Sequence, residues 1–517
     1  MAKHVAKHVA KRKTRNARGA QFLIGLAMAG GFVATSLTFT RVSTGVVDVI
    51  DADASSQSLP VPHPAPGTQS TLGRQSAPAA QSAPAAESTP VQPASPAVEP
   101  PDAPETSEAL TPTSVVPAPE PASAPSRKPT SAAAAYVSPE LGKSGTVTKT
   151  ATLPDIPLGA FQDAVLPGSI ADDRGVELGS LGSGLFPIGD DEFWTVTDRG
   201  PNPEVYDDVR TFIVPTFDPM LVRVRVDGTS INVEESIPIT DNNGNGVTGL
   251  PNRTADDEST PLAADARTVL PQNINGLDPE GIVRTADGHF WIAEEYGPSL
   301  VELDATGRVL ARHLPAGLEG IYRDAGVAYP VDGALPAALQ HRKANRGLED
   351  VALLPDGKTI VAGLQSSLVV PGDKDRTITE LLTFDTSTGT TVHEFPYQFD
   401  DPSTFGDRGR KLKMSAVAPV DADHVMVQER TDSQSRYYLV ALDPADDLIA
   451  GADKRLVVNL AGVAGVPEKV ESAWLKSPDT LVVAGDNDFG LVARPYRDGE
   501  RVQNSGDGTK IIEIKLG

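Results

Sequence analysis

One pattern recurs five times between residues 183 and 488, and it limits the possible folds more than any other feature of the chain. Each copy has a short apolar run, a tight turn rich in Asp and Gly, and a second run of mainly apolar residues. Because Asp and Gly suit the backbone angles of hairpin turns, each copy predicts a β-hairpin. The copies are SGLFPIGDDEFWTVTDRG, EGIVRTADGHFWIAEEYG, EDVALLPDGKTIVAGLQS, SAVAPVDADHVMVQERTD and ESAWLKSPDTLVVAGDND.

The spacing of the copies indicates the architecture. Equivalent positions lie 97, 69, 66 and 56 residues apart, at Trp194, Trp291, Ile360, Met426 and Val482. A β unit repeating at such intervals is typical of a propeller, in which each blade buries its faces against its neighbours. We therefore predict an all-β fold with a single β-propeller of about six blades, with five and seven as alternatives. The wide first interval leaves room for another blade or a long insertion within residues 205–275.

The N-terminal part of the chain has a different composition. Its first 18 residues are rich in Lys and Arg, and an apolar run follows at residues 22–39. This order predicts an export signal or a membrane anchor within residues 1–54. Residues 55–145 are rich in Pro, Ala and Ser, and we expect them to form a disordered linker. The propeller domain is then expected to span residues 146–517.

Charge and cysteine content limit the possible partners. The formal net charge is −24, which disfavours binding to nucleic acid. The chain has no cysteine, so an exported domain would depend on a large core rather than on disulfides. We expect a monomer that is secreted or anchored on the outer face of the cytoplasmic membrane. Membrane contact would then involve only residues 20–40, if that segment is retained.

Acidic side chains recur at one position of the repeat. Eleven residues before each aligned position stand Ser183, Glu280, Glu349, Ser415 and Glu471. The first strand of a propeller blade lies nearest the axis, so these positions should converge there. Carboxylate oxygens that converge on one point suit Ca²⁺, which accepts six to eight oxygen ligands in flexible geometry. The sequence therefore predicts an axial calcium site.

Further charged residues follow the second run of each copy. The acids there are Asp198, Glu294, Glu295, Glu429, Asp486 and Asp488. Side chains alternate between the two faces of a strand, so only some of these acids should face the axis. Arg199, Arg346 and Arg430 lie in the same loops. They could form structural ion pairs with the acids or hold an anionic group of a substrate.

Other motifs carry less weight. DNNGNG at residues 241–246 fits the start of a calcium loop, but Asn252 occupies position twelve, where a complete loop has an acid. Asn-Gly pairs also form ordinary hairpin turns, so both interpretations stay open. The sequence has neither the G-x-S-x-G pattern of a serine nucleophile nor the H-E-x-x-H pattern of a zinc site.

Several of these segments together resemble one family. LDPEGIVRTADGHFWIAEEYGPSLVELDATGRVL, NRGLEDVALLPDGKTIVAGLQS, TVTDRGPNP and VAGDNDFG are similar to the phytase-like family, also called esterase-like activity of phytase, over about residues 155–515. The resemblance implies an exported bacterial β-propeller that hydrolyses phosphate esters or simple esters with Ca²⁺. The acids that match are Asp198, Asp278, Glu280, Glu294, Glu295, Glu349, Glu429, Glu471, Asp486 and Asp488. Few lysines are expected near the mouth of the propeller, which disfavours phytate itself.

These observations define a hypothesis for the site. The residues expected to bind metal are Glu280, Glu349, Glu471, Asp198, Asp486 and Asp488. Glu349 or Glu295 would act as general base, and Arg199 and Arg430 would stabilise an oxyanion. Arg199, Arg346 and Arg430 would bind the substrate, a small phosphate ester or simple ester. The alternatives are a lactonase-type ester hydrolase on the same metal frame and a non-catalytic binding module of the cell envelope.

Overall fold

The computed structural model describes residues 139–162, 176–206, 209–252, 260–492 and 503–517. The predicted export segment lies outside these residues, as does nearly all of the predicted linker. Within the described ranges, no helix has both the length and the apolar character needed to cross a membrane.

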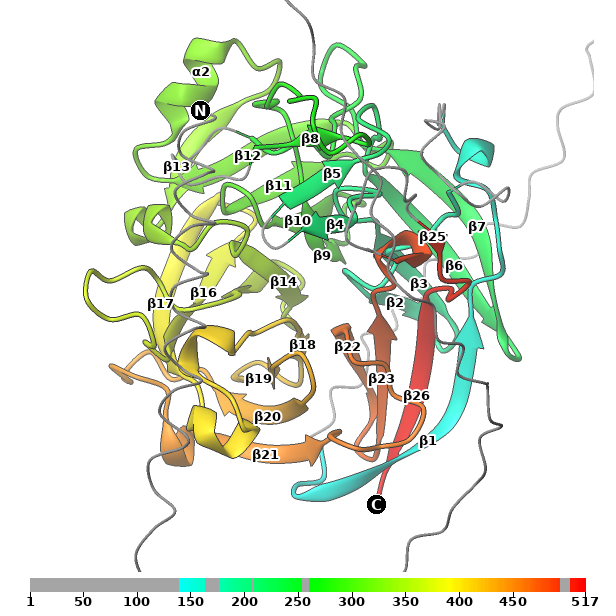
Figure 1. Ribbon diagram of the computed structural model, residues 1–517. Helices are drawn as coiled ribbons and strands as arrows, with labels where there is room; N and C mark the ends of the chain where they lie inside the picture. Colours follow the sequence, from blue (N-terminus) through cyan, green and yellow to red (C-terminus); the bar gives the residue numbers. More distant parts are fainter. Residues whose placement is uncertain (1–138, 163–175, 207–208, 253–259, 493–502) are drawn as a thin grey trace, which may run out of the picture. The chain divides into compact units, whose positions relative to one another are not determined.

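Antiparallel pairing groups most of the described strands into four-stranded units that follow one another around a ring (Figure 1). The first unit has β2 (Phe186–Gly189), β3 (Glu192–Val196), β6 (Met220–Asp227) and β7 (Ser230–Pro238). The second has β9 (Pro279–Arg284), β10 (Phe290–Glu294), β11 (Ser299–Leu303) and β12 (Val309–Pro315), with β13 (Val331–Leu335) added in parallel. The third has β14 (Leu348–Leu353), β15 (Thr359–Leu364), β16 (Ile378–Asp385) and β17 (Thr390–Gln398). The fourth has β18 (Val417–Pro419), β19 (His424–Arg430), β20 (Ser435–Ala441) and β21 (Lys454–Asn459).

The last unit joins the two ends of the described chain. It contains β22 (Val470–Ser477), β23 (Thr480–Gly485), β26 (Lys510–Leu516) and β1 (Lys143–Thr152). β1 pairs antiparallel with β26, from Gly145 opposite Leu516 to Thr152 opposite Lys510. The outermost strand of the last unit therefore comes from the start of the domain. This arrangement closes a propeller-like ring, and the predicted all-β class is confirmed.

Aromatic and aliphatic side chains fill the space between neighbouring units. Trp194 of the first unit contacts Phe290 of the second, with 4.8 Å between ring centroids. Trp291 of the second unit lies against Phe384 of the third, at 5.6 Å. Trp474 of the last unit meets Phe193 of the first, at 5.7 Å. The tryptophans thus pack between units, and the core is divided among these interfaces.

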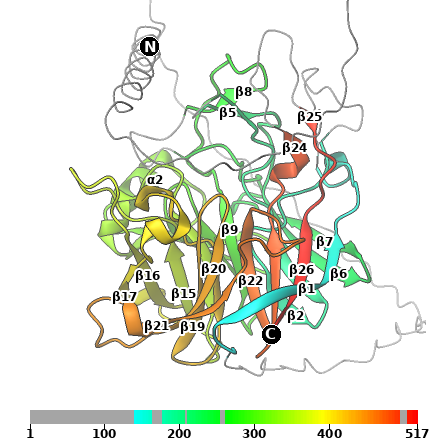
Figure 2. The same ribbon diagram turned by 60° about the horizontal axis from the view of Figure 1, so that its bottom comes forward.

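The remaining elements connect or cover the ring. β4 (Glu204–Tyr206), β5 (Val209–Phe212) and β8 (Leu262–Ala263) form a small sheet within the long first interval. Figure 2 shows β5 and β8 above one end of the ring, with β24 (Leu491–Val492) and β25 (Gln503–Asn504) nearby. α2 (Glu319–Ala325) is the one α-helix among the described residues, and it precedes β13.

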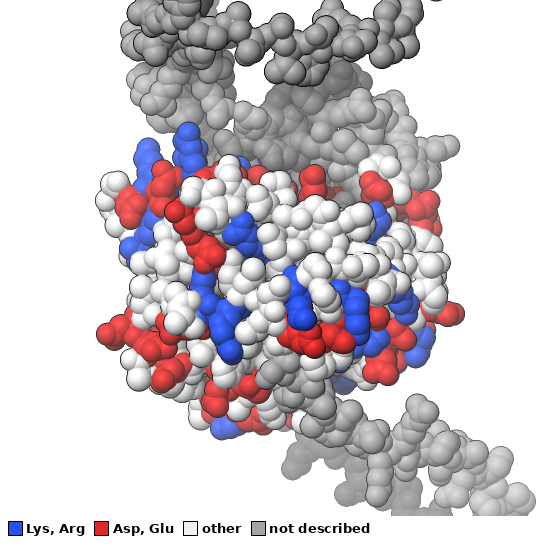
Figure 3. Space-filling view, turned by 90° about the horizontal axis from the view of Figure 1, so that it is seen from below, with Lys and Arg blue, Asp and Glu red and all other residues white. Residues whose placement is uncertain are grey.

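The outer surface carries both signs of charge. On the face shown in Figure 3, Lys and Arg side chains lie among Asp and Glu side chains. Ion pairs on the described surface include Lys149 with Asp191 at 2.9 Å and Lys476 with Glu513 at 3.1 Å. Such exposed pairs contribute little to stability, typically below about 1 kcal/mol each.

Candidate metal and substrate site

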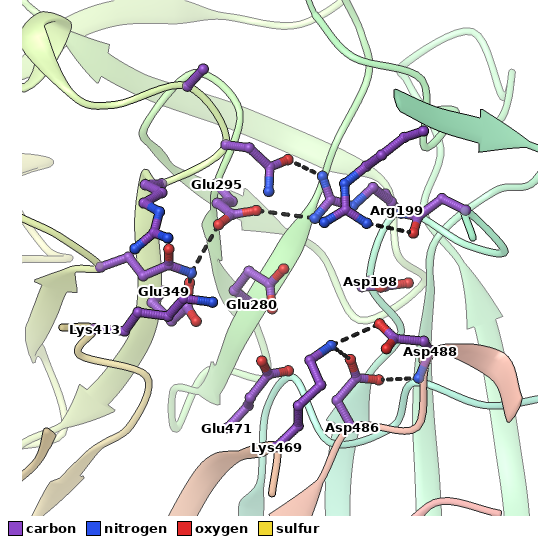
Figure 4. A pocket seen from close by; sticks show the side chains of 16 residues that line it. Asp198, Arg199, Glu280, Glu295, Glu349, Lys413, Lys469, Glu471, Asp486 and Asp488 are labelled. Carbon is purple, nitrogen blue, oxygen red and sulfur yellow. Dashed lines mark hydrogen bonds and ion pairs between the residues drawn. The ribbon is translucent and has the colours of Figure 1, made fainter. Parts of the chain in front are cut away.

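Residues of the innermost strands and of loops beside them line a polar cavity of about 460 Å³. Its wall contains seven acids and five basic side chains, which are Asp198, Glu280, Glu295, Glu349, Glu471, Asp486, Asp488, Arg199, Arg210, Arg346, Lys413 and Lys469. Asn202, Ala344, Asn345 and Gln365 complete the wall. The labelled side chains in Figure 4 face a common space and come from several units of the ring.

The glutamates that occupy equivalent positions of the repeat come together in the structure, as predicted. Glu280, Glu349 and Glu471 are each the second residue of an innermost strand, in β9, β14 and β22, and all three line the cavity. Ser415 stands at the equivalent place before β18 and donates a hydrogen bond to Oε1 of Glu349, at 2.7 Å. Repetition of one structural unit therefore brings together acids that are far apart in the sequence.

Glu280 and Glu295 of this wall form a compact group of acids with Asp278, which does not itself line the cavity. One carboxylate oxygen from each lies within 4.8 Å of the others, and all three side chains are buried. Arg199 lies beside two of them, with Nη1 2.8 Å from Oδ2 of Asp278 and Nη2 3.2 Å from Oε2 of Glu295. One guanidinium charge cannot balance three carboxylates, so the group keeps a net negative charge if all three are ionised.

Glu280 differs from the other two acids. Only 7 % of the residue is exposed, and its carboxylate has no hydrogen bond or ion pair within the described part of the chain. Figure 4 shows it near the middle of the cavity, with no dashed line to a neighbour. Burial raises the pKa of Glu280 well above its ordinary value, and the nearby carboxylates of Asp278 and Glu349 raise it further. A buried acid without a partner fits the position of a cation ligand.

Protons or a cation must compensate the neighbouring acids. Burial raises the pKa of Glu295 to about 8 and that of Asp278 to about 6, and the two carboxyl groups share a hydrogen bond. Gln365 donates from Nε2 to Oε1 of Glu295 at 2.9 Å, which fixes that side chain. A divalent cation would displace the shared proton, because metal ligands bind in their deprotonated form.

A second group of acids lies on another side of the cavity. Lys469 Nζ is 2.7 Å from Oδ2 of Asp486 and 2.7 Å from Oδ1 of Asp488. Asp198 accepts a hydrogen bond from the backbone N–H of Gly200 at 2.8 Å. Burial raises the pKa of Asp198 to about 8, with a further contribution from Asp486. This second group therefore already contains a cation of its own.

The predicted arginines occupy different places. Arg430 is 1 % exposed and lies behind the cavity wall, where Nη2 is 2.6 Å from Oε1 of Glu471 and Nε donates to Ser415 at 2.8 Å. Arg346 lines the cavity and donates from Nη1 to Oγ of Ser366, at 2.7 Å. Of the two, Arg346 is the one that can reach a bound molecule.

Two predicted neighbours of the site point elsewhere. Glu294 lies next to Glu295, but its side chain is fully buried and pairs with Arg312 at 2.9 Å. Glu429 pairs with Lys454 and accepts a hydrogen bond from the hydroxyl of Tyr397 at 2.7 Å. Neither lines the cavity, as expected from alternation along a strand.

The cavity wall also contains two lysines that were not among the predicted site residues. Lys413 and Lys469 precede the register residues Ser415 and Glu471 by two positions, as Asp278 precedes Glu280. Asp278, Lys413 and Lys469 therefore share a repeat position of their own, and this shared position is the sequence signal that identifies them. Burial lowers the pKa of Lys413 to about 8, as do Arg430 and Arg346 nearby. Its ammonium group has no hydrogen bond or ion pair among the described residues.

The loop at residues 241–246 has the geometry of a turn. Oδ1 of Asp241 accepts hydrogen bonds from the backbone N–H groups of Asn243, at 2.8 Å, and Asn245, at 2.9 Å. Thr240 and Gly246 form an antiparallel bridge across the loop. Asn252 lies apart from it and donates to the carbonyl of Gly276 at 3.1 Å. These contacts agree with the hairpin interpretation.

Comparison with known proteins gives the following similarities. A protein of Arthroderma benhamiae, described as an uncharacterized secreted protein, is 31 % identical over 137 residues, which is 23 % of this chain and 26 % of that protein. The chain thus spans about a quarter of that relative's length. Aldose sugar dehydrogenase from Streptomyces coelicolor in its PQQ-bound form is 12 % identical with a TM-score of 0.31, covering 74 % of this chain and all of that one. A luciferin-regenerating enzyme is 11 % identical with a TM-score of 0.29, covering 66 % of this chain and 80 % of that one. Residues 177–489 match the phytase-like family, described as esterase-like activity of phytase.

Proposed function

The chain belongs to the phytase-like family, and from this membership we propose that it is an exported, calcium-dependent hydrolase of phosphate esters or simple carboxylic esters. One observation carries the proposal. Glu280 is a buried carboxylate without a partner in the cavity wall, and it forms one group with Glu295 of the same wall and with Asp278. A catalytic cavity needs groups held ready for a ligand, whereas a purely structural cluster would pair them all.

The acids fit a hard divalent cation. Asp278, Glu280 and Glu295 offer carboxylate oxygens from three side chains, and Ca²⁺ prefers such ligands in flexible geometry. When bound, the ion would supply positive charge that polarises the ester and favours attack by water. Arg199 holds Asp278 and Glu295 in place through its two ion pairs, so it acts as a positioning residue.

Other residues of the cavity would handle the substrate and the protons. Glu349 accepts hydrogen bonds from Ser415 and Gln365, and burial raises its pKa, so it is suited to take a proton from attacking water. Lys413 would donate a proton to the leaving oxygen, since its pKa of about 8 lies near neutrality. Arg346 would bind the anionic or carbonyl oxygen of the substrate.

The proposal also includes the number of blades, export of the protein and the role of Arg430. We take the four-stranded units described above as the five blades of a single closed propeller. Export is supported by the basic and apolar N-terminal segment and by the description of the Arthroderma benhamiae relative as secreted. Arg430 would support Glu349 and Glu471 from behind the wall without touching the substrate.

Turnover of chromogenic esters tests this function. The full chain is assayed with p-nitrophenyl phosphate, p-nitrophenyl acetate and a simple lactone, in calcium and in excess chelator. We expect hydrolysis of the phosphate or the acetate that stops with chelator and falls strongly in Glu280→Gln. A preference for the lactone would favour the lactonase-type alternative on the same acids.

Glu302→Gln is the matched control. Glu302 is an acid of the same unit that pairs with His289 at 2.7 Å, outside the cavity. This variant should keep both the activity and its dependence on calcium. A folded protein that hydrolyses none of the substrates would favour the binding module, and turnover unaffected by chelator would contradict the metal-dependent mechanism.

A further inference from the structure

The second acidic group of the cavity contains a permanent positive charge. Lys469 extends from the residue before β22, and its ammonium nitrogen lies 2.7 Å from one oxygen of Asp486 and 2.7 Å from one of Asp488. Figure 4 shows Lys469 between Glu471 and Asp486, facing the same space as Glu280. The nitrogen thus stands where two carboxylates converge, the position that a cation would otherwise take.

The surrounding hydrogen bonds show that the acids are arranged around this charge. Oδ1 of Asp486 accepts from Oγ of Ser180 at 2.5 Å and from the backbone N–H of Asp488 at 3.0 Å, which leaves Oδ2 for Lys469. Burial alone would raise the pKa of Asp486, but Lys469 and the hydrogen bonds from Ser180 and the Asp488 N–H together outweigh it, so the pKa is lowered. Asp486 is therefore ionised and is neutralised by the chain itself.

The two acidic groups consequently differ in how much positive charge the chain itself supplies to them. Asp278, Glu280 and Glu295 share one guanidinium, and Glu280 has no partner, whereas Asp486 and Asp488 share an ammonium. We propose that Lys469 is a built-in cation that replaces a second metal ion, so that the cavity binds one divalent ion, at the group with Glu280. The proposal rests on the proposed function for the ion at Glu280, but its claim about Lys469 is separate.

Removal of the lysine charge should then open a second ion site. In Lys469→Met, Asp486 and Asp488 would lose their counter-charge, and Asp198 and Glu471 lie in the same wall to complete an oxygen-rich site. The side chain of Lys469 is 40 % exposed, so methionine removes charge without creating a deep cavity in the core. Lys469→Arg keeps a positive charge at the same place and should keep the second site closed.

Counting bound calcium tests the inference without any assay of activity. Equilibrium dialysis of the full chain against Ca²⁺ should give one ion for the unchanged protein, one for Lys469→Arg and two for Lys469→Met. The double variant Lys469→Met/Glu280→Gln should bind one ion, at the new site. Lys476→Met, on the same strand β22 but paired with Glu513, is the matched control and should bind one.

The outcomes separate this inference from the proposed function. Two ions in the unchanged protein, or no additional ion in a folded Lys469→Met, would overturn the inference. No ion in the unchanged protein together with one in Lys469→Met would contradict the proposed function and support the role of Lys469. If Lys469→Met does not fold, the variant Asp486→Asn/Asp488→Asn replaces it. This variant should still bind one ion, because the native ion is placed at the group with Glu280. Loss of that ion would overturn the inference.

Discussion

Nη2 of Arg430 lies 2.6 Å from Oε1 of Glu471, and both residues are more than nine-tenths buried. The same nitrogen is 3.8 Å from Oε1 of Glu349, so one arginine serves two acids that come from different innermost strands. Charges removed from water in this way depend on each other, because neither acid can regain its hydration when the arginine is lost.

Arg430→Met should therefore destabilise the protein considerably. Removing one partner of a buried ion pair costs about 3–5 kcal/mol, because the remaining charge stays uncompensated. Urea denaturation followed by circular dichroism measures the change. Arg223→Met is the control, since its pair with Glu192 at 2.6 Å is partly exposed and should contribute less than about 1 kcal/mol. Equal changes in the free energy of unfolding for the two substitutions would show that burial does not make the Arg430 pair more important for stability than the exposed pair.

Glu280→Gln should have opposite effects with and without calcium. In chelator at pH 8 the variant should gain about 1 kcal/mol in free energy of unfolding, because a repelling carboxylate has been removed. In calcium it should lose the stabilisation by the ion, which is about 2.7 kcal/mol at a hundredfold excess over Kd. Thermal unfolding in both conditions checks the prediction. A variant that calcium still stabilises fully would place the ion elsewhere.

Stability without metal should fall as the pH rises. The folded state raises the pKa of Asp278 to about 6 and that of Asp198 and Glu295 to about 8, each mainly by burial, from ordinary values of 3.8 for Asp and 4.5 for Glu. The folded protein therefore binds these protons more tightly than the unfolded chain does. Their contribution is fully present below about pH 4 and is lost progressively up to about pH 8.

Calcium should reduce the part of this loss that comes from Asp278 and Glu295, because it would bind these two acids in their ionised form. Free energies of unfolding are compared at about pH 5 and pH 8, in chelator and in calcium. We expect the difference between the two conditions to be larger at pH 8. A calcium effect that is larger at pH 5 would show that these acids do not bind the ion.

Lys413→Met should remove the group that donates a proton to the leaving oxygen. Loss of a general acid typically lowers the rate by about 10²–10⁴-fold, and the decline in kcat above about pH 8 should disappear with the lysine. Lys411→Met is the control, because Lys411 lies two residues away and forms an exposed pair with Asp432 at 3.4 Å. A reduced rate with an unchanged pH profile would indicate that Lys413 only helps to shape the cavity.

The strand β1 should be required for a stable ring. A chain that starts at residue 153 lacks the antiparallel partner of β26, whose apolar side chains are mostly buried. We expect it to lose cooperative unfolding, whereas a chain that starts at residue 139 should keep it. Calorimetry distinguishes the two chains. Cooperative unfolding of the shorter chain would show that the other three strands of the last unit suffice.

Repetition explains which features could be predicted from the sequence. Glu280, Glu349 and Glu471 occupy equivalent positions of a repeated hairpin, so their meeting at the cavity follows from periodicity. The partner of β1 could not be predicted in this way, because Gly145 and Leu516 belong to no repeat and lie at opposite ends of the domain.

The chemistry of single side chains was harder to predict. Glu294 and Glu295 are neighbours in the sequence, yet one pairs with Arg312 and the other faces the cavity. Their difference depends on the exact end of β10 at Glu294, and sequence patterns place strand ends poorly. Lys413 and Lys469 occupy the repeat position at which Asp278 is an acid, so a pattern of recurring acids does not include them.

The pairing of β1 with β26 also means that the start and the end of the domain are neighbours in space, with Gly145 opposite Leu516. A circularly permuted chain, with these ends joined by a short linker and new ends opened in the turn between β16 and β17, should build the same cavity. The order of the strands along the chain would then determine only which strand is synthesised first. The cavity and its chemistry would be the same in the permuted chain.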